Sequence, residues 1–178
     1  PDHFQRIGDM SDPQYDIINI LAGIKPGSRY ASLRESRPET TSVATDLHVT
    51  LFEIDDDAIG LDAIARQAVG LRIGVLERYE PYIKRCSGRL SELGADEATI
   101  AAIKSGPDAV EDALLRAIIA HTDLLTTASR DGSAAAIDAL RAAGLSESGI
   151  VTLSQLIAFC SYQIRMATTM SAIAGGAR

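Results

Sequence analysis

The chain has 178 residues, of which 46% are hydrophobic and 23% are charged, a length and balance typical of a soluble globular protein with one sizeable core. Its formal net charge is −7 and no basic run is present, which argues against nucleic acid as a partner. No apolar run approaches the length of a membrane span, and no stretch has the pattern of a signal peptide. Two cysteines without framework spacing are typical of a reducing compartment, so we expect a cytoplasmic protein without a membrane partner.

The first 59 residues are expected to form an N-terminal helical extension that makes one compact unit with the rest of the chain. Residues 1–13 are interpreted as a loose lead-in, and short helices are predicted over 16–24 and 28–36 because turn residues separate two helical patterns. A longer helix is predicted over 41–52. Its inward side chains are expected to be Val43, Leu47, Leu51 and Phe52.

Three consecutive aspartates at positions 55–57 resemble a metal-binding loop only superficially. The further carboxylates, glycine and glutamate of a calcium site are absent, so the stretch is interpreted as a solvated loop. None of the three histidines has ligand spacing with another, and no metal or cofactor is expected.

The stretch from 61 to 103 organises the chain and predicts a helix, a break, a second helix, a turn and a third helix. The first helix begins near Leu61 and is apolar around most of its circumference, so it is expected to be buried on nearly all sides. Gly70 and Gly74 lie four residues apart on it, which predicts close backbone approach by another helix. Pro81 suits the first turn of a helix and places the start of the second helix near position 80.

The end of this stretch carries clear boundary signals. Gly94 predicts the end of the second helix, and Asp96 predicts the cap of the third, whose inward residues are Ile100 and Ile103. The same pattern of apolar anchor, glycine and capped restart recurs around Gly144 and Ser146. The remaining helices are predicted over 106–128, 134–143 and 146–173. No strand pattern is present, so the fold class is predicted to be all-α.

This pattern resembles the carboxymuconolactone decarboxylase superfamily, which includes the alkylhydroperoxidase AhpD-like proteins. Those proteins carry Arg-Glu on one helix and, near the start of the next, Cys-x-x-Cys-x-x-x-His followed eight residues later by Gly. Counting back from Gly94 places the histidine position at Cys86 and the cysteine positions at Tyr82 and Tyr79, and the Arg-Glu pair falls on Arg66-Gln67.

The resemblance extends over about residues 60–174. The segment 139–146 and the later Ala158-Phe159 and Arg165 look like the C-terminal part of the family's peroxidase-related branch. It implies an AhpD-like helical domain over 60–178 that assembles as a homo-oligomer, from a dimer to a hexamer.

The residues that carry the family's chemistry are replaced here. In the family a thiolate attacks the hydroperoxide, the second cysteine forms a disulfide, and Glu and His move protons. Neither Tyr79 nor Tyr82 can form a disulfide, and Gln67 cannot act as a carboxylate base. The two-cysteine peroxidase mechanism is therefore not expected, although the family's class is hydroperoxide-reducing oxidoreductase. The superfamily's other reaction, decarboxylation of a lactone acid, uses a histidine for proton transfer. Cys86 stands at that histidine position here, so this reaction is not expected either.

Two interpretations of Cys86 stay open. Arg85 and Arg89 lie close along the same helix and would favour a thiolate, which would make a one-cysteine peroxidase or thiol sensor. Alternatively, Cys86 is a small buried apolar residue, as free cysteine commonly is. Cys160 is expected in the core, and a bond between Cys86 and Cys160 is a further alternative.

Tyr79, Tyr82, Gln67 and Cys86 are the candidate pocket residues. Two phenols in place of two thiols would bind a small organic acid or hydroperoxide by hydrogen bonds and ring contact, or would simply fill volume. Glu77 and His121 are possible auxiliary groups. The alternatives are a capping role for Glu77 and a hydrogen-bonded core role for His121, which His48 is expected to share.

Three functions follow. The first is a divergent AhpD-like protein that keeps a small-molecule pocket but lacks two-cysteine alkylhydroperoxidase chemistry. The second is an oxidoreductase that acts through Cys86 alone. The third is a non-catalytic oligomeric scaffold. Whether the protein is an enzyme stays open between them.

Overall fold

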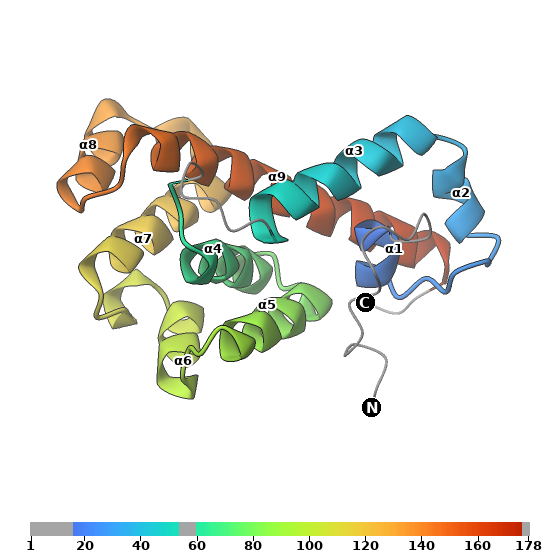
Figure 1. Cartoon of the computed structure of the whole chain (residues 1–178), viewed down its shortest axis with the longest axis horizontal. Coiled ribbons are helices and arrows are strands. Elements are labelled where there is room, and N and C mark those ends of the chain that lie inside the picture. Colours follow the sequence, from blue (N-terminus) through green and yellow to red (C-terminus); the bar gives the residue numbers. More distant parts are fainter. Residues whose placement is uncertain (1–15, 54–59, 176–178) are drawn as a thin grey trace. The chain divides into compact units, whose positions relative to one another are not determined.

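The computed structural model describes residues 16–53 and 60–175, and within these ranges it contains helices and no strand (Figure 1). The all-α prediction is therefore confirmed. The predicted lead-in over 1–13 and the aspartates 55–57 lie outside the described residues. The chain divides into two compact units, one formed by residues up to 54 together with 163 onward, the other by residues 55–162. The sequence suggested a boundary near residue 60 and none within the last helix.

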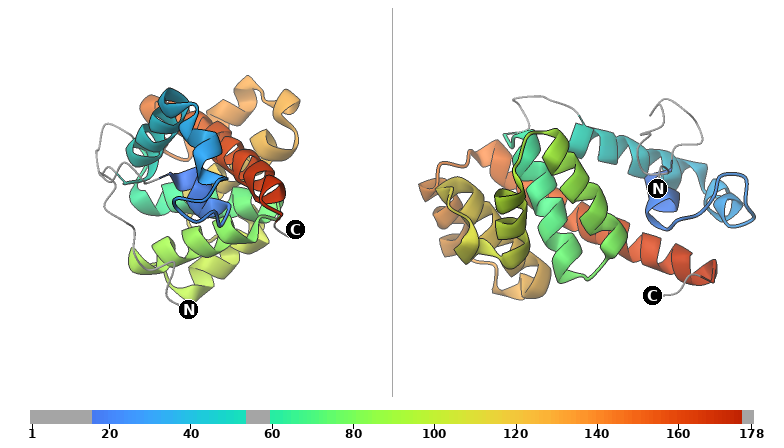
Figure 2. Two further views of the ribbon diagram at one scale, coloured as in Figure 1. Left: turned by 90° about the vertical axis from the view of Figure 1, so that its right-hand side faces the viewer. Right: turned by 90° about the horizontal axis from the view of Figure 1, so that it is seen from below.

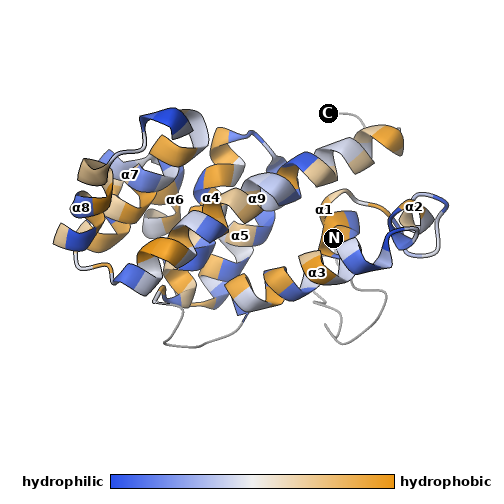
Figure 3. Cartoon of the chain, turned by 90° about the horizontal axis from the view of Figure 1, so that it is seen from above, coloured by the Kyte–Doolittle hydropathy of each residue, from blue (hydrophilic) through white to orange (hydrophobic). Residues whose placement is uncertain are grey.

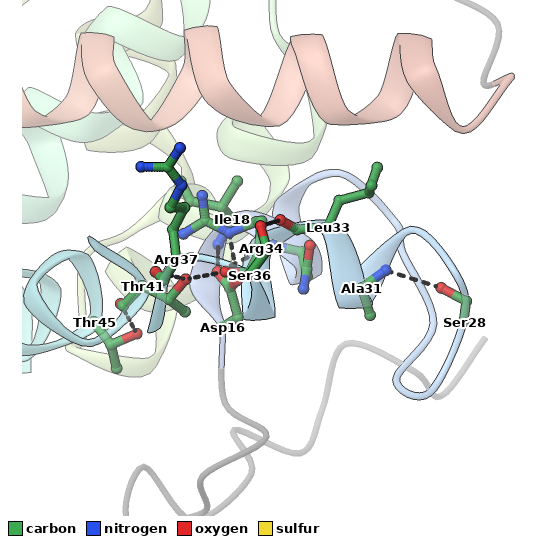
Figure 4. Close-up of polar contacts among 11 residues, drawn as sticks. Asp16, Ile18, Ser28, Ala31, Leu33, Arg34, Ser36, Arg37, Thr41 and Thr45 are labelled. Atoms are coloured by element: carbon green, nitrogen blue, oxygen red, sulfur yellow. Dashed lines mark hydrogen bonds and ion pairs between the residues drawn. The ribbon is translucent and has the colours of Figure 1, made fainter. Parts of the chain in front are cut away.

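The first unit is built from short helices and the end of a long one. These are α1 (Ile17–Leu21), α2 (Ala31–Glu35), α3 (Pro38–His48), a π-helical turn η1 (Val49–Glu53) and the C-terminal part of α9 (Glu147–Ile173). Asp16 begins α1, because its carboxylate accepts a hydrogen bond from the Ile18 amide at 2.9 Å. The same carboxylate binds Nε of Arg34 at 2.5 Å, and both side chains are buried (Figure 4). The pair joins α2 to α1.

The predicted inward face of the helix over 41–52 is partly wrong. Val43 is 63% exposed and Leu47 is 38% exposed, whereas Ala44 and His48 are buried. The buried row lies one residue further along the chain. Its members, Ala44, His48 and Phe52, are spaced at intervals of four and share one face of the helix. After His48 the helix widens into the π turn, so Leu51 is also buried. Figure 3 shows apolar and polar colours alternating along α3.

The second unit has α4 as its central helix. It contains α4 (Ala63–Leu76), α5 (Glu80–Glu92), α6 (Glu97–Ser105), η3 (Pro107–Ala109), α7 (Ala113–Thr127), η4 (Ser129–Asp131), α8 (Ala134–Ala142) and the N-terminal part of α9. Ten consecutive residues of α4, from Ala65 to Gly74, are buried, and α5, α6 and α7 all pack against it (Figures 1 and 2). Burial on nearly all sides is thus confirmed, except at Ile64, which is exposed.

Close backbone contacts hold this arrangement. A Cβ atom on Gly74 would lie 3.2 Å from Cγ1 of Ile83, so α5 approaches α4 as the glycine predicted. At the start of the unit, a Cβ atom on Gly149 of α9 would lie only 2.5 Å from the carbonyl oxygen of Gly60. The chain that leads into α4 therefore crosses the first turn of α9 with no room for a side chain.

The predicted helix ends are confirmed at both repeats of the pattern. Gly94 and Gly144 have φ of 91° and 98°, the left-handed conformation in which glycine ends a helix. The Ala95 amide donates to the Leu90 carbonyl at 2.9 Å, and the Leu145 amide donates to the Leu140 carbonyl at 3.0 Å. After these ends, Asp96 and Ser146 begin α6 and α9 by accepting hydrogen bonds from Thr99 and Gly149.

One predicted helix start is wrong. The helix expected from 106 begins at Ala113, after a single 3₁₀ turn over Pro107–Ala109. Val110 is extended, with ψ of 122°, and so interrupts the helical path. Asp112 then provides the cap, because its carboxylate accepts the Leu115 amide at 2.7 Å.

Candidate functional site

The turn between α4 and α5 carries the first candidate residue. The amide of Tyr79 donates to the Gly74 carbonyl at 2.9 Å, and the amide of Arg78 donates to the Val75 carbonyl at 3.2 Å. This is the hydrogen-bond pattern of a helix end that normally uses glycine at the left-handed position. Here that position is Arg78, with φ of 55°, the one non-glycine residue with positive φ in the described part of the chain. Tyr79 follows in extended conformation as the residue before α5.

Tyr82 and Cys86 lie one turn apart on the buried face of α5, and each is 2% exposed. Cys160, on the part of α9 that belongs to the same unit, is completely buried. The Tyr82 hydroxyl lies beside the Cys160 thiol, and Cys86 lies close enough to Cys160 for the two groups to interact electrostatically. The structure therefore brings together two of the predicted pocket residues and Cys160, which was expected in the core, with a bond to Cys86 as an alternative.

Both cysteines are free thiols. Burial raises the pKa of Cys86 far above its usual range, an effect to which the neighbouring Cys160 adds and which Arg85 opposes. Burial also raises the pKa of Cys160 to about 12, with the Tyr82 hydroxyl opposing the shift. Both groups are therefore thiols at neutral pH, and the phenol of Tyr82, whose pKa burial raises well above 10, is neutral as well.

The remaining pocket candidates lie on both sides of the turn. Gln67 is buried within α4 together with Arg66, in the part of the helix that is enclosed on all sides. Glu77 and Tyr79 are partly exposed, and burial raises the pKa of the Tyr79 phenol. Each of these two side chains has an interaction partner. The turn is thus the one place where the predicted pocket residues meet solvent.

His121 lies on α7 and is buried, as its position in an apolar stripe predicted. The predicted hydrogen bond is missing: neither ring nitrogen has a partner among the described residues. Burial lowers the pKa of the imidazole, so the ring is neutral at pH 7. Buried polar atoms are nearly always satisfied in proteins, which makes this side chain a position where a water or a ligand would supply the missing partner.

A metal centre is not formed by the residues that the structure describes, since no three His, Cys, Asp or Glu side chains there are grouped to hold an ion. Across residues 16–53 and 60–175, none of the helices has the combination of length and apolar character needed to cross a bilayer.

Comparisons with known proteins identify the fold. No family model and no curated protein matches the chain. An uncharacterized peroxidase-related protein from Silicibacter sp. TM1040 superposes with a TM-score of 0.70 at 16% identity, over 92% of this chain and 87% of the other. The alkylhydroperoxidase AhpD core of an uncharacterized peroxidase-related protein from Ralstonia eutropha JMP134 gives 0.69 at 18% identity, with the same coverage of both chains. The chain has the AhpD-like fold.

Within the AhpD-like fold, the local frame expected for the motif is present. Tyr79 stands directly before α5, Tyr82 lies in its first turn, and Cys86 follows one turn later. The framework residues that predicted this geometry were Pro81 and Gly94, which act locally. The contact between Tyr82 and Cys160 spans 78 positions in the sequence, and no local signal could have revealed it.

Proposed function

We propose that this chain is an AhpD-like protein that binds a small organic ligand and does not reduce hydroperoxides through a thiol. The observation that carries the proposal is the state of the two cysteines, because both are buried and both have a raised pKa. A hydroperoxide is attacked by a thiolate, so a buried thiol at neutral pH lacks the reactive form.

The rise in the pKa of Cys160 is large enough to determine its protonation state at neutral pH. With a pKa of about 12, Cys160 is almost entirely a thiol at pH 7, and the pKa of Cys86 is raised in the same direction. Thiolate fraction and access both limit reaction with a peroxide, and neither is favourable here. This supports the ligand-binding hypothesis over the alternative of a one-cysteine oxidoreductase.

Two features support binding. Tyr79 and Glu77 are accessible at the turn that follows α4, and a phenol hydroxyl can donate to a carboxylate or peroxide oxygen. The unsatisfied ring of His121 offers one donor and one acceptor in the same unit. Small organic acids and organic hydroperoxides are therefore the ligand classes to test, the latter as bound and unreacted molecules.

The test combines turnover with binding. Wild-type protein is assayed for reduction of cumene hydroperoxide with dithiothreitol as reductant, and a panel of small carboxylic acids and hydroperoxides is screened by calorimetry. We expect no turnover above the protein-free rate, and binding that Tyr79→Phe or His121→Phe weakens. Tyr30→Phe, which alters a tyrosine of the other unit, should leave binding unchanged. Turnover that Cys86→Ser abolishes would overturn the proposal in favour of the one-cysteine oxidoreductase, and absence of any binding would favour the scaffold.

A second candidate, assembly with further copies of the chain as a dimer to hexamer, has its own supporting observation. Large apolar side chains are exposed preferentially in the first unit. Its exposed members are Ile20, Leu33, Val43, Leu47 and Ile173. A unit of this size buries little core by itself, so an apolar partner surface would stabilise it.

The assembly is tested by light scattering on the wild type and on Val43→Asp combined with Leu47→Lys. We expect an oligomer that this double variant dissociates and that Val151→Asp, on the second unit, leaves intact. A monomeric wild type at micromolar concentration would overturn the assembly without affecting the ligand-binding proposal.

A further inference from the structure

His48 forms a buried polar cluster that none of the candidate functions uses. It is the last residue of α3 and is 2% exposed. Its Nδ1 lies 3.1 Å from Nε2 of Gln163, a fully buried residue of α9, and its Nε2 lies 3.7 Å from a carboxylate oxygen of Glu53 at the end of the π turn. Its ring also lies 5.0 Å from that of Phe52. All four residues belong to the first unit.

The geometry of the cluster fixes the proton on the ring. The Gln163 nitrogen carries two hydrogens and can only donate, so His48 Nδ1 accepts and is unprotonated. Nε2 then carries the single proton and directs it toward the Glu53 carboxylate. The hydrogen bond that joins α9 to α3 at this point therefore requires a neutral imidazole.

The helices that pack around His48 carry further charged groups in the part of the chain that the structure describes. α1 and α2, which both pack against α3, bring Asp16 and Arg34, and these two are bound to each other at 2.5 Å. On α3 itself, Asp46 is exposed, and on α9 Arg165 is exposed two residues after Gln163. The Glu53 carboxylate lies 3.7 Å from Nε2 of the ring, where its negative charge stabilises a protonated imidazole.

We propose that His48 is a proton-sensitive clasp that secures the C-terminal end of α9 to α3 when neutral and releases it when protonated. A proton on Nδ1 turns that atom into a donor facing the Gln163 amide nitrogen, which is also a donor, so the hydrogen bond is lost. Gln163 is completely buried, so any new arrangement of its amide has to be accommodated inside a close-packed region. Histidine is the side chain whose ordinary pKa allows a change of charge between about pH 5 and pH 8, the range in which a proton-sensitive contact can respond to mild acid.

The experiment is hydrogen exchange of the full chain at pH 7.5 and pH 5.5, with rates corrected for the intrinsic effect of pH. In the wild type we expect the amides of residues 163–173 to lose about five- to tenfold in protection at pH 5.5, the size of one net hydrogen bond. Amides of α4 and α5 in the second unit report any general effect of acid. The comparison is repeated with His121→Phe as the parent protein, so that protonation of the buried His121 at low pH does not contribute to the result.

Two variants separate the clasp from general acid sensitivity. His48→Phe keeps an aromatic ring beside Phe52 and should make protection of residues 163–173 independent of pH. Gln163→Met keeps the length of the side chain and should give the lower protection already at pH 7.5, with no further loss on acidification. Equal acid sensitivity in wild type and His48→Phe would overturn the proposal, as would unchanged or increased protection of the wild type at pH 5.5.

Discussion

The Arg72 guanidinium holds the Asp123 carboxylate by two parallel hydrogen bonds, 2.6 Å from Nε and 2.7 Å from Nη2. Its third nitrogen donates to the Lys104 carbonyl at 2.7 Å, so one side chain of α4 fastens α7 and the end of α6. Gly106 lies directly against the guanidinium, since a Cβ atom there would be 3.3 Å from Nη2. The pair is largely buried, and such charge-assisted double bonds are among the stronger polar interactions in proteins.

Removal of one partner should therefore be costly. We expect Asp123→Asn to lower the free energy of unfolding by about 2–3 kcal/mol, because it leaves the Arg72 charge buried without its counter-ion. Urea unfolding followed by circular dichroism measures the change. Arg141→Ala, which removes an exposed ion pair with Glu147, is the control and should have a much smaller effect. Equal losses in the two variants would show that the Arg72 pair contributes no more than a surface contact.

The close contact between Gly60 and Gly149 predicts a reversal of the usual effect of alanine in helices. Gly149→Ala would gain helix propensity, but its Cβ atom would lie 2.5 Å from the Gly60 carbonyl oxygen. We expect a net loss of about 2–3 kcal/mol in the free energy of unfolding. Gly88→Ala on the exposed side of α5, where nothing lies within 4 Å, should instead gain about 0.5–1 kcal/mol. Thermal unfolding of both variants gives the comparison, and a stabilising Gly149→Ala would contradict the crossing.

The left-handed backbone conformation of Arg78 predicts that a substitution by glycine stabilises the protein. Arg78→Gly should raise the free energy of unfolding by about 1 kcal/mol, because a side chain disfavours this conformation. The reverse change at an equivalent helix end, Gly94→Arg, should lower it by a similar amount, since a Cβ atom there meets nothing within 4 Å and the cost lies in the backbone alone. Denaturant unfolding of the two variants should therefore shift in opposite directions. A neutral or destabilising Arg78→Gly would indicate that the Arg78 side chain itself contributes to the turn.

The buried thiols predict a loss of stability in alkaline solution. The pKa of Cys160 is about 12 in the folded chain, against an ordinary value of 9.0, and that of Cys86 is raised in the same direction. Above pH 9 the unfolded chain releases these protons while the folded chain retains them, so the free energy of unfolding falls as the pH rises. Each thiol contributes a slope of up to about 1.4 kcal/mol per pH unit. Below pH 9 both states hold the protons and neither thiol contributes a slope.

This pH dependence is measured by urea unfolding between pH 7 and pH 10, and the slope that Tyr82 adds near pH 10 is common to the wild type and the Cys160 variant. Cys160→Ala should remove one thiol's share of the slope above pH 9. Identical slopes in wild type and variant would mean that Cys160 titrates normally. Reaction with a thiol reagent gives an independent check, since both cysteines should react slowly in the folded chain and rapidly in urea.

Local signals in the sequence were sufficient for much of the second unit. Pro81, Gly94 and Asp96 act within a few residues of where they stand, and the corner between α5 and α6 has the boundaries that they predicted. The burial of α4 followed in the same way from its apolar residues, and the AhpD-like fold followed from the spacing of the framework. Positions such as Tyr79 and Tyr82 could be placed at the start of α5 for that reason.

Other features depended on information that no local pattern contains. The inward face of α3 was mispredicted because its buried positions, Ala44 and His48, are less apolar than the exposed Val43 and Leu47, so the hydrophobic pattern favoured the wrong row. Arg78 adopts a conformation for which glycine is the usual signal. The contact between Tyr82 and Cys160 joins helices that are far apart in the chain, and the cluster of His48, Gln163 and Glu53 is equally non-local. Candidate site residues could be listed from sequence, but their grouping required the fold.

The division of α9 between the two units has a consequence for the order in which the protein folds during synthesis. Residues 16–53 leave the ribosome first, yet the unit to which they belong includes residues from 163 onward. Residues 55–162 form a contiguous unit and can complete their contacts while translation continues. The unit encoded first is therefore the one completed last, and its short helices, with their exposed apolar side chains, await the end of α9.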